Sequence, residues 1–207
     1  MEGFGFFAGH LYKLERMEEW NCNTFTIDGV RMHACKGKSP LTDAKMKIDA
    51  LKVGKRMKVL DICTGLGYTA IEARKRGAKV ISIEKDENVL ELMKHNEASE
   101  GLFGGEIEIV MGDAFEKVLE FEADSFERIM LDPPTFKFAP LLYSGEFYRR
   151  LFRVLKKGGI LLHYTGGVGG KYRGKDIQKG VMNRLREAGF MGVCKLSQIA
   201  CVRAEKI

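Results

Sequence analysis

The stretch Met57-Lys58-Val59-Leu60-Asp61-Ile62-Cys63-Thr64-Gly65-Leu66-Gly67 decides the fold of this 207-residue chain. Residues 57–62 are mostly apolar and predict a buried strand, and residues 69–76 predict a helix. Glycine between them lets the backbone turn sharply and approach a bound ligand without a Cβ in the way. In an open α/β sheet such a turn lies at the carboxyl edge of the strands, where ligands bind.

Downstream of this turn, strands and helices alternate along the chain. Such alternation predicts right-handed βαβ units and a parallel sheet covered by helices. Two closing strands within residues 191–203, with no helix between them, predict an antiparallel ending. The other strands are expected at residues 79–83, 107–110, 126–131 and 160–164, and the other helices at residues 42–51, 87–99, 114–119, 144–154 and 175–188, with a turn at 155–159.

Residues 1–38 predict an irregular lead-in that contains one small β-hairpin. Asp28-Gly29 separates two β-prone runs, and Asp-Gly in that position is a strong hairpin signal. We expect two parts, the lead-in 1–38, whose hairpin caps one edge, and an α/β domain, 39–207. The fold class expected for the domain is a doubly wound, mostly parallel seven-stranded sheet with a C-terminal antiparallel hairpin.

Composition argues against several classes of protein. The chain is 45% apolar and 30% charged, and it has no apolar run near the roughly 20 residues that cross a membrane. Five cysteines, an odd number without a Cys-x-x-Cys pair, argue against disulfides and thiolate zinc and favour a cytoplasmic location. His10, His33 and His95 lack the spacing of metal ligands, so no metal site is predicted. A net charge of +6 is compatible with phosphate binding and equally with an ordinary Lys- and Glu-rich surface.

Acidic residues follow four successive predicted strands. The first two, Asp61 beside the glycine turn and Glu84 at the end of the second strand, are also typical of dinucleotide-binding enzymes. Two further acids distinguish this chain from the dinucleotide-binding pattern. Asp113 follows the third strand, and Asp132 follows the fourth. The parallel strands end at one edge of the sheet, so these four side chains are expected to converge there.

As an ordered set, these acids and the glycine turn resemble the class I (Rossmann-like) S-adenosylmethionine-dependent methyltransferases, and most of all the small uncharacterised ones of archaeal type. The resemblance covers roughly residues 42–207 and implies S-adenosylmethionine (AdoMet) as the cofactor. It implies that Asp61 organises the turn and contacts the methionine end, that Glu84 holds the ribose, and that Asp113 accepts from the adenine amino group. The expected cofactor-binding residues are Asp61, Cys63, Gly65, Gly67, Glu84, Lys85, Asp113, Ala114 and Asp132, with Cys63 standing where the family often has glycine.

The segment Asp132-Pro133-Pro134-Thr135-Phe136 is expected to face the methyl group. It resembles the Asp-Pro-Pro-aromatic motif of exocyclic-amine methyltransferases of nucleic acids, although here the aromatic residue comes one position later. His163 ends the fifth strand, where it either accepts a proton from the acceptor or is a core histidine. The expected catalytic residues are Asp132, Pro133, Pro134, Phe136 and His163.

A glycine-rich basic segment, residues 166–175, follows the fifth strand and favours RNA as the acceptor. Its basic and aromatic side chains are candidates for gripping phosphates and stacking a base, namely Lys171, Tyr172, Arg173 and Lys175. The alternatives are a small-molecule methyltransferase, an aminopropyltransferase, which would resemble a Gly-Gly-Gly-Asp-Gly turn that this chain lacks, or an NAD-dependent oxidoreductase. The oligomeric state stays open, with a homodimer as one candidate.

Overall fold

The computed structural model describes residues 4–33, 37–166, 171–172 and 175–207. Its central strands are β5 (Lys58–Ile62), β6 (Lys79–Glu84), β7 (Ile107–Met111), β8 (Phe126–Leu131), β9 (Leu155–Tyr164), β12 (Met191–Leu196) and β13 (Cys201–Glu205). They form one seven-stranded sheet in the order β12-β13-β9-β8-β5-β6-β7. Strands β5 to β9 pair in parallel, whereas β13 is antiparallel to both β9 and β12. The predicted fold class is therefore confirmed.

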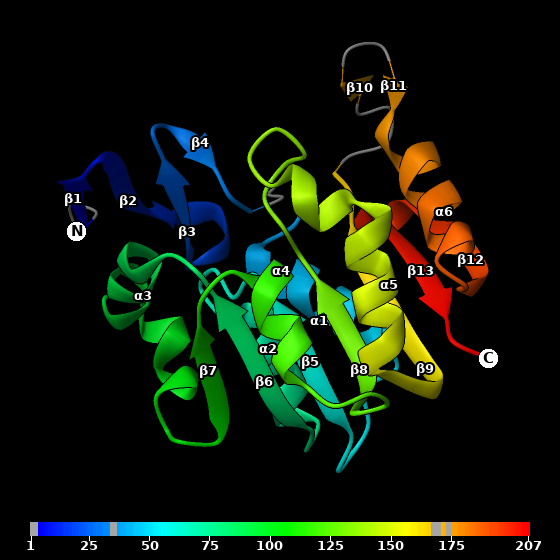
Figure 1. Ribbon diagram of the computed structural model, residues 1–207. Coiled ribbons are helices and arrows are strands. Elements are labelled where there is room, and N and C mark those ends of the chain that lie inside the picture. Colours follow the sequence, from blue (N-terminus) through cyan, green and yellow to red (C-terminus); the bar gives the residue numbers. More distant parts are fainter. Residues whose placement is uncertain (1–3, 34–36, 167–170, 173–174) are drawn as a thin grey trace.

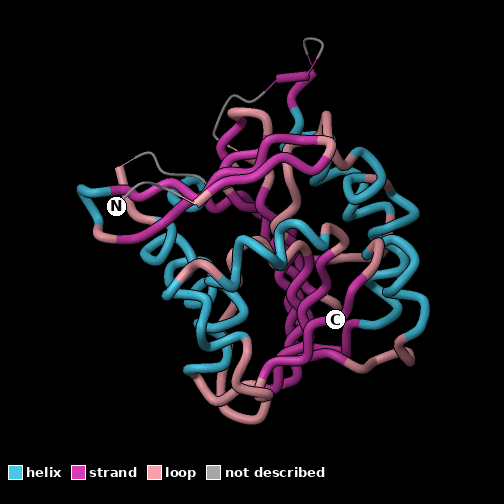
Figure 2. The backbone as a smooth tube through the Cα atoms, turned by 90° about the vertical axis from the view of Figure 1, so that its left-hand side faces the viewer, coloured by secondary structure: helices cyan, strands magenta, loops and turns pink. Residues whose placement is uncertain are grey.

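Helices cover both faces of this sheet, as Figures 1 and 2 show. They are α1 (Pro40–Ala50), α2 (Tyr68–Lys75), α3 (Glu87–Lys94), α4 (Ala114–Lys117), α5 (Gly145–Val154) and α6 (Ile177–Glu187). Successive side chains of a strand point to opposite faces, so each strand contributes to two hydrophobic cores. On β5, Val59 packs with residues of α1 to α3, whereas Leu60 and Ile62 pack with residues of α4 to α6. The carboxyl ends of the parallel strands meet along the edge that neither helix layer covers.

The N-terminal residues form a four-stranded antiparallel sheet and not merely a hairpin. Its strands are β1 (Gly5–Ala8), β2 (His10–Met17), β3 (Cys22–Ile27) and β4 (Val30–Arg31). Asp28 and Gly29 have φ angles of 49° and 75°, as a two-residue type I′ turn requires, so the predicted hairpin is β3–β4. The expectation of an otherwise irregular lead-in was wrong, because Tyr12 and Leu14 bury one face of β2.

The N-terminal sheet lies over the carboxyl ends of the parallel strands (Figure 1). Hydrogen bonds to the α/β domain help to hold it there. Tyr12 Oη donates to Asp86 Oδ2 at 2.7 Å, and Tyr68 Oη at the start of α2 donates to the Asn23 carbonyl at 2.8 Å. The sheet therefore covers the edge at which the predicted site lies.

Several predicted boundaries differ from the structure. The helix expected at 87–99 ends at Lys94 and is followed by a 3₁₀ turn, and the helix expected at 175–188 begins at Ile177, where Asp176 caps it. The turn expected at 155–159 is instead the beginning of β9. Gly158 donates its N–H to the Lys206 carbonyl at 2.7 Å, so the backbone there is paired with the C-terminal strand. Pairing with this distant segment is not encoded in the local sequence.

Candidate active site

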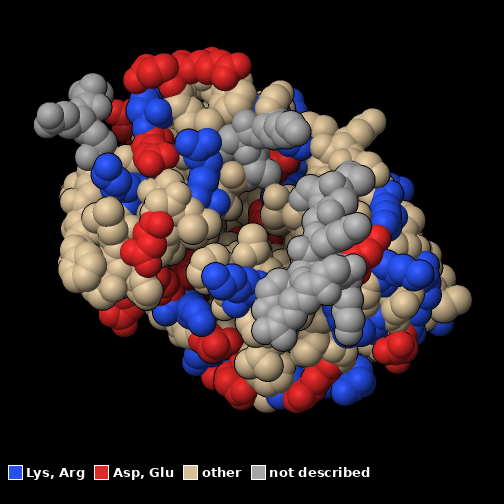
Figure 3. Space-filling view, turned by 90° about the horizontal axis from the view of Figure 1, so that it is seen from above, with Lys and Arg blue, Asp and Glu red and all other residues tan. Residues whose placement is uncertain are grey.

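A cavity of about 530 Å³ opens between the N-terminal sheet and the carboxyl edge of the parallel strands. Binding sites for small ligands usually measure about 300–1,000 Å³. Figure 3 looks down on this end of the molecule, where a hollow opens near the centre. Residues that follow four successive parallel strands line the cavity, namely Cys63, Thr64, Gly65, Glu84, Lys85, Gly112, Asp113, Ala114, Asp132 and Pro134.

The glycine-rich turn after β5 adopts left-handed backbone conformations at three positions. The φ angle is 69° at Cys63, 55° at Gly65 and 76° at Gly67. A Cβ at Gly67 would lie 2.3 Å from Leu102 Cδ1, so glycine is required there and this residue shapes the turn without lining the cavity. Left-handed backbone costs a residue with a side chain about 1 kcal/mol or more. This cost explains why the family often has glycine where this chain has Cys63.

Asp61 lies beneath the turn and not in the cavity. Its side chain is buried and accepts hydrogen bonds from Thr69 Oγ1 at 2.7 Å and from Ser82 Oγ at 2.6 Å. Asp61 therefore ties the first turn of α2 to strand β6. Burial raises the pKa of Asp61 to about 7, although both hydroxyl hydrogen bonds oppose this shift. The structure places Asp61 to organise the turn, and its contact with the methionine end stays a prediction.

Glu84 presents a fixed carboxylate to the cavity. It accepts hydrogen bonds from the backbone N–H groups of Gly65 at 3.1 Å, Lys85 at 2.9 Å and Asp86 at 3.1 Å. Burial raises the pKa of Glu84, while these three backbone donors act in the opposite direction. The carboxylate that is predicted to hold the ribose is thus held in place by the turn itself.

Asp113 and Ala114 lie at the start of α4, on the same wall of the cavity. Asp113 Oδ1 caps the helix by accepting from the Phe115 N–H at 2.9 Å, and Oδ2 lies 3.9 Å from Lys85 Nζ. A carboxylate has acceptor capacity for more than one donor. Capping the helix therefore leaves Asp113 able to accept from a ligand.

Asp132 meets a partner that sequence reasoning missed. Its Oδ2 lies 2.6 Å from Nζ of Lys47, which is 4% exposed and projects from α1. Burial lowers the pKa of Lys47, but the carboxylates of Asp132 and Asp43 outweigh it and raise that pKa above its ordinary value, so Lys47 is a cation. The sequence alone shows Lys47 as one of many helical lysines, and no local signal distinguishes it.

Of the aromatic residues in the loop after Pro134, Phe138 lines the cavity, whereas Phe136, which the sequence predicted, does not. Phe136 packs edge-on against Tyr143, with ring centroids 5.4 Å apart, and Tyr143 Oη donates to the Pro134 carbonyl at 3.0 Å. Phe138 is 53% exposed and lines the cavity. Pro133 lines a smaller cavity of about 70 Å³, whose wall shares Pro134 and Phe138 with the main cavity.

His163 lies in the core and not beside the cavity. It is fully buried, and its Nδ1 lies 3.2 Å from Tyr148 Oη. Burial lowers the pKa of His163 to about 3, so the ring is neutral. Strand β9 is covered on both faces, and the side chain of His163 lies beside Tyr148 of α5 and near the charge of Arg184 on α6. Of the two hypotheses for His163, this placement favours the core histidine.

The residues that line the cavity fit AdoMet. Glu84 offers a carboxylate for ribose hydroxyls, Asp113 offers one for an exocyclic amine, and the turn at Gly65 presents backbone at close range. Carboxylates at this density also suit a sulfonium cation. Of the basic segment predicted to bind RNA, Arg173 and the side chains of Lys171, Tyr172 and Lys175 lie outside the described residues, so that prediction stays open.

The described residues contain no cluster of three or more His, Cys, Asp or Glu residues arranged to hold a metal ion. Nor do they include a helix with the length and apolar character needed to span a membrane.

Comparisons with known proteins agree with this site. Residues 59–159 match a family model described as a methyltransferase domain. An uncharacterised protein of Methanocaldococcus jannaschii is 54% identical over 183 residues, which cover 88% of this chain and 64% of that protein. Ribosomal RNA large subunit methyltransferase I of Aeromonas hydrophila is 31% identical over 125 residues, or 56% of this chain and 32% of the relative. The chain thus spans less than two thirds of the length of these relatives.

A solved structure shares the fold over nearly the whole chain. Spermidine synthase in complex with the transition-state analogue AdoDATO has a TM-score of 0.78 and 20% identity. The match covers 99% of this chain and 73% of the spermidine synthase. At that coverage the likeness includes the N-terminal sheet as well as the α/β domain.

The matched domain, the fold and the relatives together support a class I Rossmann-like AdoMet-dependent methyltransferase. Residues 59–159 form a domain of that type, whose cofactor is AdoMet.

Glu84→Gln and Asp113→Asn should each weaken AdoMet binding about tenfold, because each replaces a charged acceptor in the cavity by a neutral amide. Titration calorimetry with AdoMet measures the change directly. Glu87→Gln is the matched control, since Glu87 is exposed at the start of α3 and does not line the cavity. Equal dissociation constants for all three variants would contradict the assignment of Glu84 and Asp113.

Proposed function

We propose that the chain is an AdoMet-dependent methyltransferase whose acceptor is a small amine bound in the covered cavity. The observation that carries this proposal is the charge of the cavity wall, where six carboxylates face two lysines. Burial lowers the pKa of His33, which also lines the cavity, to about 3, so this ring adds no charge. Such a wall attracts a cationic amine and repels the phosphates of a nucleic acid. The carboxylates are those of Asp28, Asp43, Glu84, Asp86, Asp113 and Asp132.

The cover over the cavity supports the same proposal. Strands β2 to β4 contribute apolar and aromatic residues to the wall, among them Phe25 and Val30, and Tyr68 adds a ring from α2. Aromatic faces attract ammonium groups. A base of structured RNA would have to be extruded and to enter beneath this sheet. A small molecule meets no such obstacle.

In this reaction the main task of the protein is to align the nucleophile with the methyl group. AdoMet supplies a methyl group on a sulfonium sulfur that is already activated to leave. Asp132 accepts the N–H of the acceptor nitrogen and takes its proton as the nitrogen forms a bond to the methyl carbon and the carbon–sulfur bond breaks, its electrons remaining on sulfur. Pro134, whose carbonyl accepts a hydrogen bond from Tyr143 Oη, lines the same cavity. Holding two reactants in this geometry is itself a large part of catalysis.

Two other acceptor reactions have an observation in their favour. RNA methylation, which the sequence favoured, is supported by the similarity to the ribosomal RNA methyltransferase. Aminopropyl transfer is supported by the similarity to spermidine synthase over 99% of the chain. The glycine turn argues against the second, because Cys63-Thr64-Gly65-Leu66-Gly67 does not match the Gly-Gly-Gly-Asp-Gly turn.

The deciding experiment incubates the protein with methyl-labelled AdoMet and three separated fractions of cell extract: small molecules, RNA and protein. We expect label in the small-molecule fraction, retained by cation exchange and insensitive to nuclease. Label in nuclease-sensitive RNA would show that the acceptor is an RNA base and not a small amine. Product formation from decarboxylated AdoMet, with none from AdoMet, would establish aminopropyl transfer instead.

A further inference from the structure

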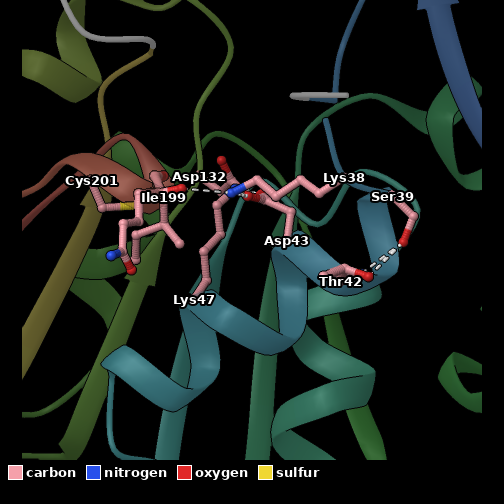
Figure 4. Close-up of polar contacts among 9 residues, drawn as sticks. Lys38, Ser39, Thr42, Asp43, Lys47, Asp132, Ile199 and Cys201 are labelled. Atoms are coloured by element: carbon pink, nitrogen blue, oxygen red, sulfur yellow. Dashed lines mark hydrogen bonds and ion pairs between the residues drawn. The ribbon is translucent and has the colours of Figure 1, made fainter. Parts of the chain in front are cut away.

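A row of four alternating charges runs from the cavity through α1 (Figure 4). Lys47 Nζ lies 2.6 Å from Asp132 Oδ2 and 2.8 Å from Asp43 Oδ2. Asp43 Oδ1 lies in turn 2.7 Å from Lys38 Nζ, which donates to the Gln198 carbonyl at 2.9 Å. Burying an ion pair is costly and often adds no net stability over an apolar pair of similar size. Stability alone therefore does not explain why the buried Lys47 ammonium lies directly beside the Asp132 carboxylate.

Lys47 occupies one oxygen of Asp132 and leaves the other available. The ammonium group takes Oδ2, while within the described part of the chain no hydrogen bond reaches Oδ1. The Asp132 side chain is 23% exposed and lines the cavity, and the centroid of the Tyr164 ring lies 4.3 Å from Lys47 Nζ. The carboxylate thus has one oxygen held by Lys47 and one that keeps its capacity to accept a hydrogen bond.

We propose that Lys47 is a positioning residue of the transfer reaction, which holds Asp132 ionised with Oδ1 turned toward the acceptor nitrogen. This inference rests on the proposed function only for the identity of that nitrogen. Helix α1 carries none of the motifs predicted from the sequence. The proposal nevertheless gives one of its residues, Lys47, control over the Asp132 carboxylate that receives the proton.

The electrostatic surroundings support this role. Asp132 is packed among groups that disfavour its charge, because burial raises its pKa and Asp43 acts in the same direction. Lys47 is the group that lowers the pKa of Asp132, by its charge and by its hydrogen bond. Titratable groups face this pair from several elements packed around it. They are His33 after β4, Asp43 on α1, Asp61 on β5, Cys63 after β5, Tyr143 before α5, Tyr164 on β9 and Cys201 on β13.

The test that needs no acceptor follows the Asp132 carboxyl by NMR in protein labelled with ¹³C at aspartate carboxyl groups. We expect Lys47→Met to shift the Asp132 titration to higher pH. Burial raises the pKa of Asp132, and in this variant no adjacent cation lowers it again. Lys38→Met is the matched control, since it removes a lysine of the same row that does not touch Asp132. If Lys47→Met does not fold, Lys47→Gln, which also removes the charge, serves the same comparison. An unchanged Asp132 titration in the charge-removing variant overturns the proposal.

A kinetic comparison follows once an acceptor fraction is known. We expect Lys47→Met to lower kcat about tenfold or more while AdoMet affinity changes less than about threefold, and Lys47→Arg to restore part of the loss. A purely structural role would lower stability and spare kcat, with no rescue by arginine. The two failures are distinguishable, because absence of methyl transfer to any amine refutes the proposed function and leaves the Asp132 titration to decide the role of Lys47.

Discussion

Asp61→Asn is expected to make the protein more stable at pH 8 than the parent and to abolish much of the pH dependence of unfolding. The folded protein holds the proton of Asp61 more tightly than the unfolded chain, because the pKa is about 7 in the fold against an ordinary 3.8. The contribution of this group is therefore fully present below pH 3.8 and is lost as the pH rises to 7. Three pKa units correspond to at most about 4 kcal/mol.

Urea unfolding without AdoMet, at a series of pH values from 4 to 8, measures this prediction. The gap in unfolding free energy between the variant and the parent should widen across that range and stay constant above it. Glu84 is also buried with a raised pKa, so the parent carries other pH-dependent contributions, and the difference between the two proteins isolates Asp61. Thr69→Val should act in the opposite sense, since it removes a hydroxyl that lowers the pKa of Asp61. Parallel stability curves for Asp61→Asn and the parent would show that Asp61 is ionised in the fold at all these pH values.

The elements that sequence reasoning located share a local cause. Asp28-Gly29 predicts its hairpin because two successive left-handed residues favour glycine and aspartate. Glu84, Asp113 and Asp132 converge because parallel strands end at one edge whatever their order in the sheet. In both cases a short segment carries its own geometry, and the remaining fold does not need to be known.

The misses share the opposite cause. Strand β1 depends on pairing with β2, and β2 on pairing with β3. Lys47 becomes part of the site only because it reaches from α1 to Asp132, which follows β8. The loop after Pro134 brings Phe138 to the cavity, whereas Phe136 packs against Tyr143, whose Oη also donates to the Pro134 carbonyl. These contacts join separate segments of the chain, and no local pattern specifies them.

Asp132→Asn is expected to lower kcat by roughly 10²–10³-fold while AdoMet affinity stays within about threefold of the parent. The Lys47 ammonium beside Asp132 dictates how the new amide lies: its oxygen must face Lys47, so its NH₂ faces the cavity. An N–H donor then stands where the acceptor nitrogen needs an oxygen that accepts. Asparagine keeps the size of the side chain, so a loss of turnover reflects this reversal and not a new void.

The effects of Asp132→Asn on kcat and on AdoMet affinity should be the reverse of those of Glu84→Gln. When both variants are measured with the same labelled AdoMet, each serves as the control for the other. Glu84→Gln should raise the dissociation constant of AdoMet and leave kcat near the parent value at saturating cofactor, because Glu84 lies at the end of β6, away from the Asp132 loop. Thermal unfolding of each variant checks that the fold is retained. Loss of AdoMet binding in Asp132→Asn with normal turnover at saturation would exchange the two roles, and Asp132 would then be a cofactor ligand whose partnership with Lys47 serves binding.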